Sequence, residues 1–314
     1  MAESSSLTTI SRFYFRPPSD LQPPAAEEAE ERFKETDELP SISSARNRRK
    51  EMERRVALTL HHRTSTRLED VGMQLWPSAF LLADFLLHTT ASTIITKNSH
   101  NRHCDYSGAA LVELGAGIGL IASIASFLHC KAFVCTDYKE DILVLARRNM
   151  LLNEHLPLSC GRNPSKVPVH FEIFDWRNPQ TFMTAHLASS SPLTSVLRVF
   201  IAADVIYDDE ITSALFQSLS LIMTTRDSFL IALEKRYNFE VESLSLTPHG
   251  YATFRSFFRE IDSCYWLSVP LSNEVPGGTL TGFVGRRIDL DAIPIYFEGY
   301  ERSKDMELWE LRLI

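Results

Sequence analysis

Several features that would assign a class immediately are missing from this 314-residue sequence. No apolar stretch approaches the roughly 20 residues that a membrane-spanning helix needs, so we expect no membrane span. The first residues lack a basic segment followed by an apolar core, and we therefore expect no secretory signal. The five cysteines include no Cys-x-x-Cys pair, which favours reduced thiols in an intracellular protein over a disulfide framework or a zinc site.

Excess positive charge is also missing. The net charge is −8, which disfavours a protein dedicated to the phosphate backbone, so we expect no direct nucleic acid partner. An acidic surface suits a basic protein segment instead. What is present, 44% hydrophobic and 23% charged residues, is typical of a globular protein.

The N-terminal part of the chain differs in composition from the rest. Paired prolines at 17–18 and 23–24 and an acidic run at 27–31 leave little apolar periodicity. Such a segment buries too little apolar surface to offset the entropy of ordering it. We expect residues 1–55 to be a largely disordered extension and residues 56–314 to form the folded domain. The basic cluster at 46–55 is a solvated stretch, a nuclear-import signal or a substrate-facing patch.

Strand and helix patterns alternate within the folded domain. Short apolar or alternating runs predict strands at 56–61, 110–114, 132–136, 167–174, 196–202, 229–233, 265–269 and 306–313. Stretches with apolar residues at helical spacing predict helices from Pro77 and at 120–128, 142–152, 211–222 and 251–261. Residues 271–292 are predicted to form an extended loop. The alternation predicts an α/β fold with a doubly wound parallel sheet and helices on both faces.

A glycine-rich loop, Glu113-Leu-Gly-Ala-Gly-Ile-Gly119, follows the predicted strand 110–114. Glycine lets a cofactor approach the backbone closely, and the helix N-terminus behind the loop offers free N–H groups. The main alternative is a nicotinamide-binding loop, whose pattern is Gly-x-Gly-x-x-Gly. Here the third glycine comes one residue early and Leu120 takes the last position, so the loop favours a methyltransferase cofactor.

Acidic residues end the next two predicted strands. At the end of its strand, Asp137 can accept hydrogen bonds from ribose hydroxyls, although a helix cap is the simpler alternative. Asp175 can accept the amino group of adenine, and Trp176 can pack beside the purine. A tryptophan of the core is the alternative for Trp176. Both positions lie where ligands bind in open α/β sheets.

The segment Ala203-Asp-Val-Ile-Tyr207 follows the fourth strand of the sheet. Amino-group methylases of nucleic acids place two prolines there to clamp a flipped base. Val205 and Ile206 occupy those positions here. Asp204 and Tyr207 are therefore available for another acceptor, and an amine fits a carboxylate and a phenol. Simple packing is the alternative for Tyr207.

Together with Trp76, these motifs resemble those of the seven-strand protein lysine methyltransferases, the methyltransferase-like family sixteen. The resemblance covers about residues 56–314 and implies a methyltransferase domain with a mostly parallel, seven-stranded, Rossmann-like sheet and S-adenosyl-L-methionine as cofactor. It implies that Asp204 and Tyr207 orient the acceptor lysine and that residues 234–236 line the substrate entrance. It also implies a set of cofactor contacts: Trp76, Glu113, Gly115, Ala116, Gly117, Gly119, Asp137, Asp175, Trp176 and Ala203.

The resemblance also implies a partner, a protein substrate that presents a lysine. It points to a nucleic-acid-associated nuclear protein of the Kin-seventeen type, methylated by a monomer located in the nucleus and cytoplasm. Three other functions stay open: a small-molecule methyltransferase on the same fold, a non-catalytic binding module and, least favoured because of Leu120, a nicotinamide dehydrogenase.

Overall fold

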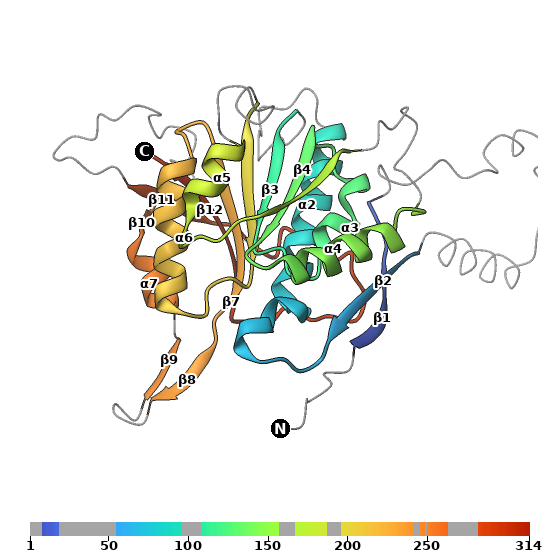
Figure 1. The fold of residues 1–314 in the computed structure, drawn as a ribbon, viewed down its shortest axis with the longest axis horizontal. Coiled ribbons are helices and arrows are strands. Elements are labelled where there is room, and N and C mark those ends of the chain that lie inside the picture. The colour runs from blue at the N-terminus through green and yellow to red at the C-terminus, as the bar shows by residue number, and fades with distance from the viewer. Residues whose placement is uncertain are drawn as a thin grey trace, which may run out of the picture.

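A computed structural model describes residues 8–18, 55–95, 108–156, 167–186, 196–240, 245–248, 250–262 and 282–314. Eight of its strands build one central sheet. They are β3 (Ala110–Leu114), β4 (Ala132–Asp137), β5 (Val169–Ile173), β6 (Arg198–Ala203), β7 (Ser228–Glu234), β10 (Phe258–Glu260), β11 (Phe283–Arg287) and β12 (Met306–Leu313). Across the sheet their order is β10-β11-β12-β7-β6-β3-β4-β5 (Figure 1).

The sheet is mostly parallel. Five of its seven strand pairs are parallel, and the two antiparallel pairs both involve β12, which lies between β7 and β11. The strand order reverses direction between β3 and β6, as in a doubly wound sheet. The predicted α/β class is confirmed. The expected seven strands become eight in the structure, because the short strand β10 adds to one edge.

Helices cover both faces of the sheet. On one face lie α2 (Pro77–Ile95), α3 (Leu120–Ser123) and α4 (Glu140–Leu152), and on the other lie α5 (Pro179–His186), α6 (Asp209–Ile222) and α7 (Tyr251–Ser256) (Figure 1). Successive side chains of a strand point to opposite faces, so each inner strand supplies both cores. In β6, Ile201 packs in the α2 core while Phe200 packs in the α6 core.

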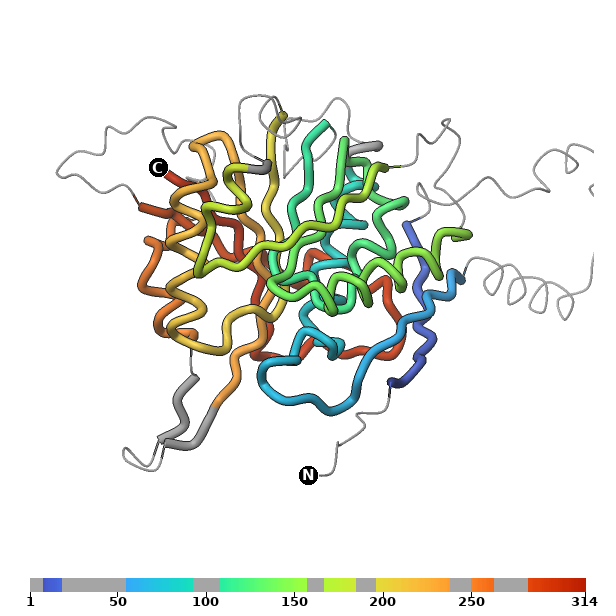
Figure 2. The backbone as a smooth tube through the Cα atoms, in the orientation of Figure 1, coloured from blue at the N-terminus to red at the C-terminus, as the bar shows by residue number. Residues whose placement is uncertain are grey.

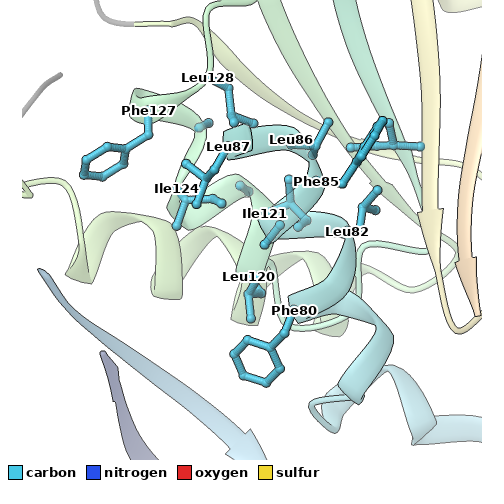
Figure 3. Close-up of a cluster of buried hydrophobic side chains, with 14 of the residues drawn as sticks. Phe80, Leu82, Phe85, Leu86, Leu87, Leu120, Ile121, Ile124, Phe127 and Leu128 are labelled. Atoms are coloured by element: carbon cyan, nitrogen blue, oxygen red, sulfur yellow. The ribbon is translucent and has the colours of Figure 1, made fainter. Parts of the chain in front are cut away.

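The first core joins α2 to α3. Figure 3 shows one cluster of buried apolar side chains, which includes Phe80, Leu82, Phe85, Leu86 and Leu87 of α2, Leu120 and Ile121 of α3, and Ile124 just after α3. Pro77 is the first residue of α2, where a proline's missing N–H costs nothing. This packing fixes the start of α2, and therefore the neighbouring Trp76, against the glycine loop. Within the described ranges, no helix has the length and apolar character needed to cross a membrane.

A separate two-stranded sheet pairs β1 (Thr8–Phe15) antiparallel with β2 (Val56–Arg63). The segment between β11 and β12 runs beside β1 (Figure 2), where the Arg16 N–H donates to Tyr296 O and the Glu298 N–H to Tyr14 O. We expected residues 1–55 to be largely disordered, and Thr8–Phe15 correct that expectation. The remainder of that extension, residues 1–7 and 19–54, lies outside the described residues.

Three other predicted elements differ. The helix expected at 120–128 is α3 followed by a separate 3₁₀ turn, Ala125–Phe127. The helix expected at 251–261 ends at Ser256, and β10 follows because residues 258–260 pair with β11. The loop expected at 271–292 contains β11, while residues 271–281 and the strand expected at 265–269 lie outside the described residues.

Candidate functional site

A cavity of about 750 Å³ opens at the carboxyl ends of β3, β4 and β6. A 3₁₀ segment, Leu68–Met73, and the start of α2 form its opposite wall. Of the twelve residues predicted for the site, all except Gly119 line this cavity. They are Trp76, Glu113, Gly115, Ala116, Gly117, Asp137, Asp175, Trp176, Ala203, Asp204 and Tyr207.

The glycine loop is shaped by positive φ angles and close neighbours. Gly115 and Gly117 have φ of 68° and 53°, a region that disfavours residues with a Cβ. A Cβ on Gly115 would lie 2.9 Å from Val205 Cγ1, and one on Gly117 would lie 2.9 Å from Gly72 O. These two glycines therefore keep the cavity floor open and let the 3₁₀ segment approach.

Gly119 serves packing instead. A Cβ there would lie 2.8 Å from the Cβ of Ala146, so this glycine lets α3 approach α4. It does not line the cavity. Glycine is needed at position 119 for the packing of the two helices. The cofactor contact that we expected for Gly119 does not agree with its position outside the cavity lining.

Two carboxyl groups, Asp137 and Glu113, lie buried in the cavity wall. The Gly117 N–H donates to Asp137 Oδ2 at 3.0 Å, and the Tyr138 N–H to Oδ1 at 2.8 Å. Burial nevertheless raises the pKa of Asp137 to about 6. Burial, and next the charge of Asp137, raise the pKa of Glu113 well above its ordinary value. The site therefore favours a positive group or hydroxyl donors beside these oxygens.

The 3₁₀ segment is tied to the residues that follow β4. The Tyr138 hydroxyl donates to Glu69 O, and Lys139 Nζ donates to the same oxygen at 2.7 Å and to Asp70 Oδ1 at 2.8 Å. Trp76 Nε1 donates to Val71 O at 3.0 Å, which orients the indole at the end of the segment. Neither Tyr138 nor Lys139 was predicted, because both look like ordinary surface residues next to a motif.

At the end of β5, Arg177 changes the surroundings of Asp175. Its Nε and Nη2 each lie 3.0 Å from a carboxylate oxygen of Asp175, and these hydrogen bonds lower the pKa of Asp175. The carboxylate is thus already paired, whereas we expected it to await an adenine amino group. Trp176 lies beside the glycine loop, where a Cβ on Gly115 would touch its ring at 3.4 Å. Arg177 was missed because a single arginine after a motif carries no signal.

Asp204 has an unusual backbone. It is the one non-glycine residue of the described ranges with a positive φ, 56°, a conformation that costs energy and clusters at functional sites. The N–H groups of Ser78 and Glu234 each donate to one carboxylate oxygen at 3.2 Å. Burial raises the pKa of Asp204, and Arg236, with Nη2 3.4 Å from Oδ2, opposes this.

Tyr207 completes the predicted acceptor pair. Burial raises the pKa of its phenol to about 12, so the hydroxyl stays protonated at neutral pH. Behind it, a Cβ on Gly250 would lie 3.2 Å from the Tyr207 nitrogen, so the start of α7 packs directly on this turn. The Asp208 carboxylate caps α6 by accepting from the Ile211 N–H at 2.8 Å. Tyr207 is held between two helix starts, beside Asp204 in the cavity wall.

The side chains of the predicted entrance residues 234–236 contact different parts of the molecule. Glu234 accepts from the Ser303 hydroxyl at 2.6 Å, and Lys235 pairs with Glu307 at 3.2 Å. Of the three side chains, Arg236 is the one that contacts residues of the cavity wall, Asp204 and Trp76.

S-adenosylmethionine, the expected cofactor, fits the polar groups of the cavity. Within the described part of the chain, the buried atoms Glu113 Oε2 and Trp176 Nε1 have no hydrogen-bond partner, so each awaits a ligand group. Glu113 would hold the ammonium of the methionine end, Asp137 the ribose hydroxyls, and Trp176 would lie beside the adenine. The space kept by Gly115 and Gly117 lets the ligand lie against the backbone.

Among the solved structures that are similar to this chain are two methyltransferases. The methyltransferase domain of bacterial CtHen1 is 11% identical with a TM-score of 0.40, covering 74% of this chain and 100% of that one. A TehB-like SAM-dependent methyltransferase from Corynebacterium glutamicum is 8% identical with a TM-score of 0.37, covering 88% and 100%.

Comparisons of sequence are more specific. Methyltransferase-like protein 22 of Mus musculus is 29% identical over 269 residues, covering 81% of this chain and 58% of that protein. Its Homo sapiens counterpart is 29% identical over 263 residues, covering 81% and 57%. The chain thus spans just under three fifths of these relatives. A resemblance to methyltransferase-like protein 22 is predicted by the segments at 61–62, 68–76, 81–85, 207–209, 234–239 and 308–309, and these matches confirm it. A family model described as lysine methyltransferase matches residues 54–247, and the chain belongs to that family.

Proposed function

We propose that this protein transfers a methyl group from S-adenosylmethionine to the side-chain amine of a lysine in a protein substrate. The observation that carries the proposal is the placement of Asp204 and Tyr207. Both line the cavity that also contains the glycine loop and Asp137. Acceptor-binding groups and cofactor-binding groups therefore share one cavity wall.

Bound S-adenosylmethionine would supply a methyl group already activated on a sulfonium. The work left to the protein is to hold the amine close to that methyl group and in line with it. The Asp204 carboxylate is well suited, because two main-chain N–H groups fix its oxygens. The protonated Tyr207 hydroxyl adds a neutral hydrogen-bonding group beside it.

The acceptor must also lose a proton, since a free lysine has a pKa of about 10.4. An apolar, partly closed site lowers the pKa of a lysine by disfavouring its charged form. Val205 and Ile206 follow Asp204 and are both buried, so the segment 203–207 is apolar apart from Asp204 and Tyr207. We infer that Asp204 positions the amine and that desolvation releases its proton to solvent.

For the substrate, the family resemblance supports a nucleic-acid-associated nuclear protein of the Kin-seventeen type. We propose further that this protein acts as a monomer in the nucleus and the cytoplasm. The acidic net charge of −8 suits a basic segment of such a partner. A small-molecule acceptor is the competing outcome of the experiment below.

The test incubates tritiated cofactor with cell extract and the purified protein, and follows the label. We expect label in protein, recovered on methylated lysine after hydrolysis. Label confined to the small-molecule fraction would refute a protein acceptor.

The matched variant is Asp204→Asn, because asparagine tolerates the positive φ that alanine does not. We expect transfer to fall about 100-fold or more. Affinity for S-adenosylhomocysteine, measured by calorimetry, should change little. A collapse of that affinity would instead assign Asp204 to the cofactor.

A further inference from the structure

Arg236 lies where β7 ends and the hairpin of β8 (Tyr237–Glu240) and β9 (Ser245–Pro248) begins (Figure 1). Its guanidinium carbon is 4.2 Å from the centroid of the Trp76 ring, and its Nη2 is 3.4 Å from Asp204 Oδ2. Trp76 and Asp204 line the cavity and Arg236 does not. The guanidinium therefore contacts two residues of the cavity wall without forming part of that wall itself.

An aromatic face beside a carboxylate is an arrangement that binds cations. The ring attracts a cation through its quadrupole, and the carboxylate adds a charge-assisted hydrogen bond. A lysine ammonium presented to Asp204 needs these same two partners. In this structure both are already engaged by a cation of the chain itself.

The three partners of the Asp204 carboxylate differ in their freedom to leave. Ser78 and Glu234 donate through main-chain N–H groups, one at the start of α2 and one at the end of β7. Arg236 forms an ion pair through a long side chain that is 35% exposed, whereas the Asp204 side chain is 2% exposed. Arg236 is thus the partner that can move aside without breaking main-chain contacts, and its departure opens the approach to Asp204.

We propose that Arg236 occupies the acceptor-lysine subsite in the resting protein and that the substrate's ammonium displaces it. This inference rests on the proposed function, because it takes Asp204 as the acceptor-binding group. The exchange makes Arg236 a specificity-determining residue. A cationic acceptor replaces one charge with another, while a neutral molecule would leave the guanidinium in place.

The first test observes the displacement directly by NMR in the 314-residue chain. The Trp76 ring current shifts the side-chain resonances of Arg236, which Arg236→Gln identifies by their loss. Titration with n-butylammonium should move these resonances toward unshifted positions, while n-butanol, the same chain without the charge, should leave them. Arg226, which is exposed, serves as the internal control. Arg236 resonances that stay in place throughout the n-butylammonium titration overturn the proposal.

The second test separates displacement from a supporting role. Arg236→Gln keeps a polar side chain but shortens it and removes its charge, so the acceptor no longer competes with a guanidinium. We expect the KM for protein acceptors in extract to fall about five- to tenfold with kcat unchanged, while Arg226→Gln behaves as the wild type. A KM that rises would make Arg236 part of the acceptor-binding wall and overturn the proposal.

The two tests fail in different ways. If the wild-type protein labels no protein at all, the proposed function is wrong. The NMR titration then still decides whether a cation displaces Arg236, since it requires no methyl transfer.

Discussion

Asp137 and Glu113 place two acidic groups in one buried wall, and the charge of Asp137 makes ionisation of Glu113 less favourable. Burial is the main cause of the raised pKa of both groups, and the pKa of Asp137 reaches about 6. A ligand that donates hydroxyl or ammonium hydrogens to these oxygens binds the ionised form best. Protonation of the pair therefore opposes ligand binding.

We predict that affinity for S-adenosylhomocysteine rises with pH, by up to tenfold per unit for the proton that Asp137 loses near pH 6, and rises further where Glu113 must also lose a proton. The sign follows because a raised pKa keeps Asp137 protonated in the free protein at lower pH, and binding must remove that proton. Calorimetry between about pH 5 and pH 7 measures the profile. The variant Asp137→Asn should bind more weakly and with a flatter profile.

Asp175 provides the matched control, since it lines the same cavity with its pKa lowered by Arg177. Asp175→Asn should keep the pH profile of the wild type. An affinity of the wild-type protein that is flat across this pH range would show that ionisation of the buried pair is not linked to binding.

Residues of the site were predictable where they follow a strand. Asp137, Asp175 and Asp204 each lie at or just after the end of a predicted strand, and the parallel sheet brings such positions to one edge. Arg177 and Lys139 were not predictable, because their roles depend on partners brought close by the fold. Gly119 shows the opposite error, in which a residue of the motif serves the packing of α3 on α4.

At the scale of elements, side-chain amides on α4 and just after it hold the two-stranded sheet of β1 and β2. Asn149 Oδ1 accepts from the His61 N–H at 2.8 Å, and its Nδ2 donates to His61 O and Ile118 O, both at 2.9 Å. One turn later, Asn153 pairs with the N–H and carbonyl of Thr59 at 2.9 and 2.8 Å. The two carboxamides substitute for a neighbouring strand.

We predict that Asn149→Ala lowers the free energy of unfolding by about 2–4 kcal/mol, because it leaves buried main-chain groups of β2 unpaired. Urea denaturation measures the loss, and hydrogen exchange should locate the loosening at the His61 amide. Asn178→Ala, at an exposed asparagine, should leave both unchanged. Unaltered exchange at His61 in Asn149→Ala would contradict this anchoring role.

The elements that sequence patterns predicted well are those with strong local signals. The runs at 110–114 and 132–136 are apolar except for Glu113 and Thr136, and they became β3 and β4 with little change of bounds. β1 was missed because its partner β2 lies more than forty residues away in sequence. β10 was missed because it depends on Gly285 of β11, where a Cβ would lie 2.5 Å from the Phe258 ring.

At the scale of the whole molecule, Asp84 joins helix α2 to the C-terminal part of the chain. Its carboxylate is fully buried and accepts from the N–H groups of Tyr296 and Phe297, from the Tyr300 hydroxyl and from Arg302 Nη2 at 2.9 Å. Arg302 is itself 12% exposed. This ion pair holds the segment between β11 and β12 beneath α2.

We predict that Asp84→Leu costs about 3–5 kcal/mol of stability, because Arg302 is left as a buried unpaired charge. The double variant Asp84→Leu/Arg302→Leu should lose clearly less than the sum of the two single changes. Urea unfolding of all four proteins closes this cycle. Strict additivity would show that the two residues act independently.

The strand order has a consequence for synthesis of the chain on the ribosome. Every residue that lines the cavity lies between Arg67 and Ile211, and β7 supplies the Glu234 N–H that fixes Asp204. By contrast, β11 reaches the sheet through β12, which is the last of the described strands to be made. A nascent chain that has just released β7 therefore already carries the complete cavity wall. Cofactor bound at that stage would stabilise the unfinished domain by mass action while the last strands are still to come.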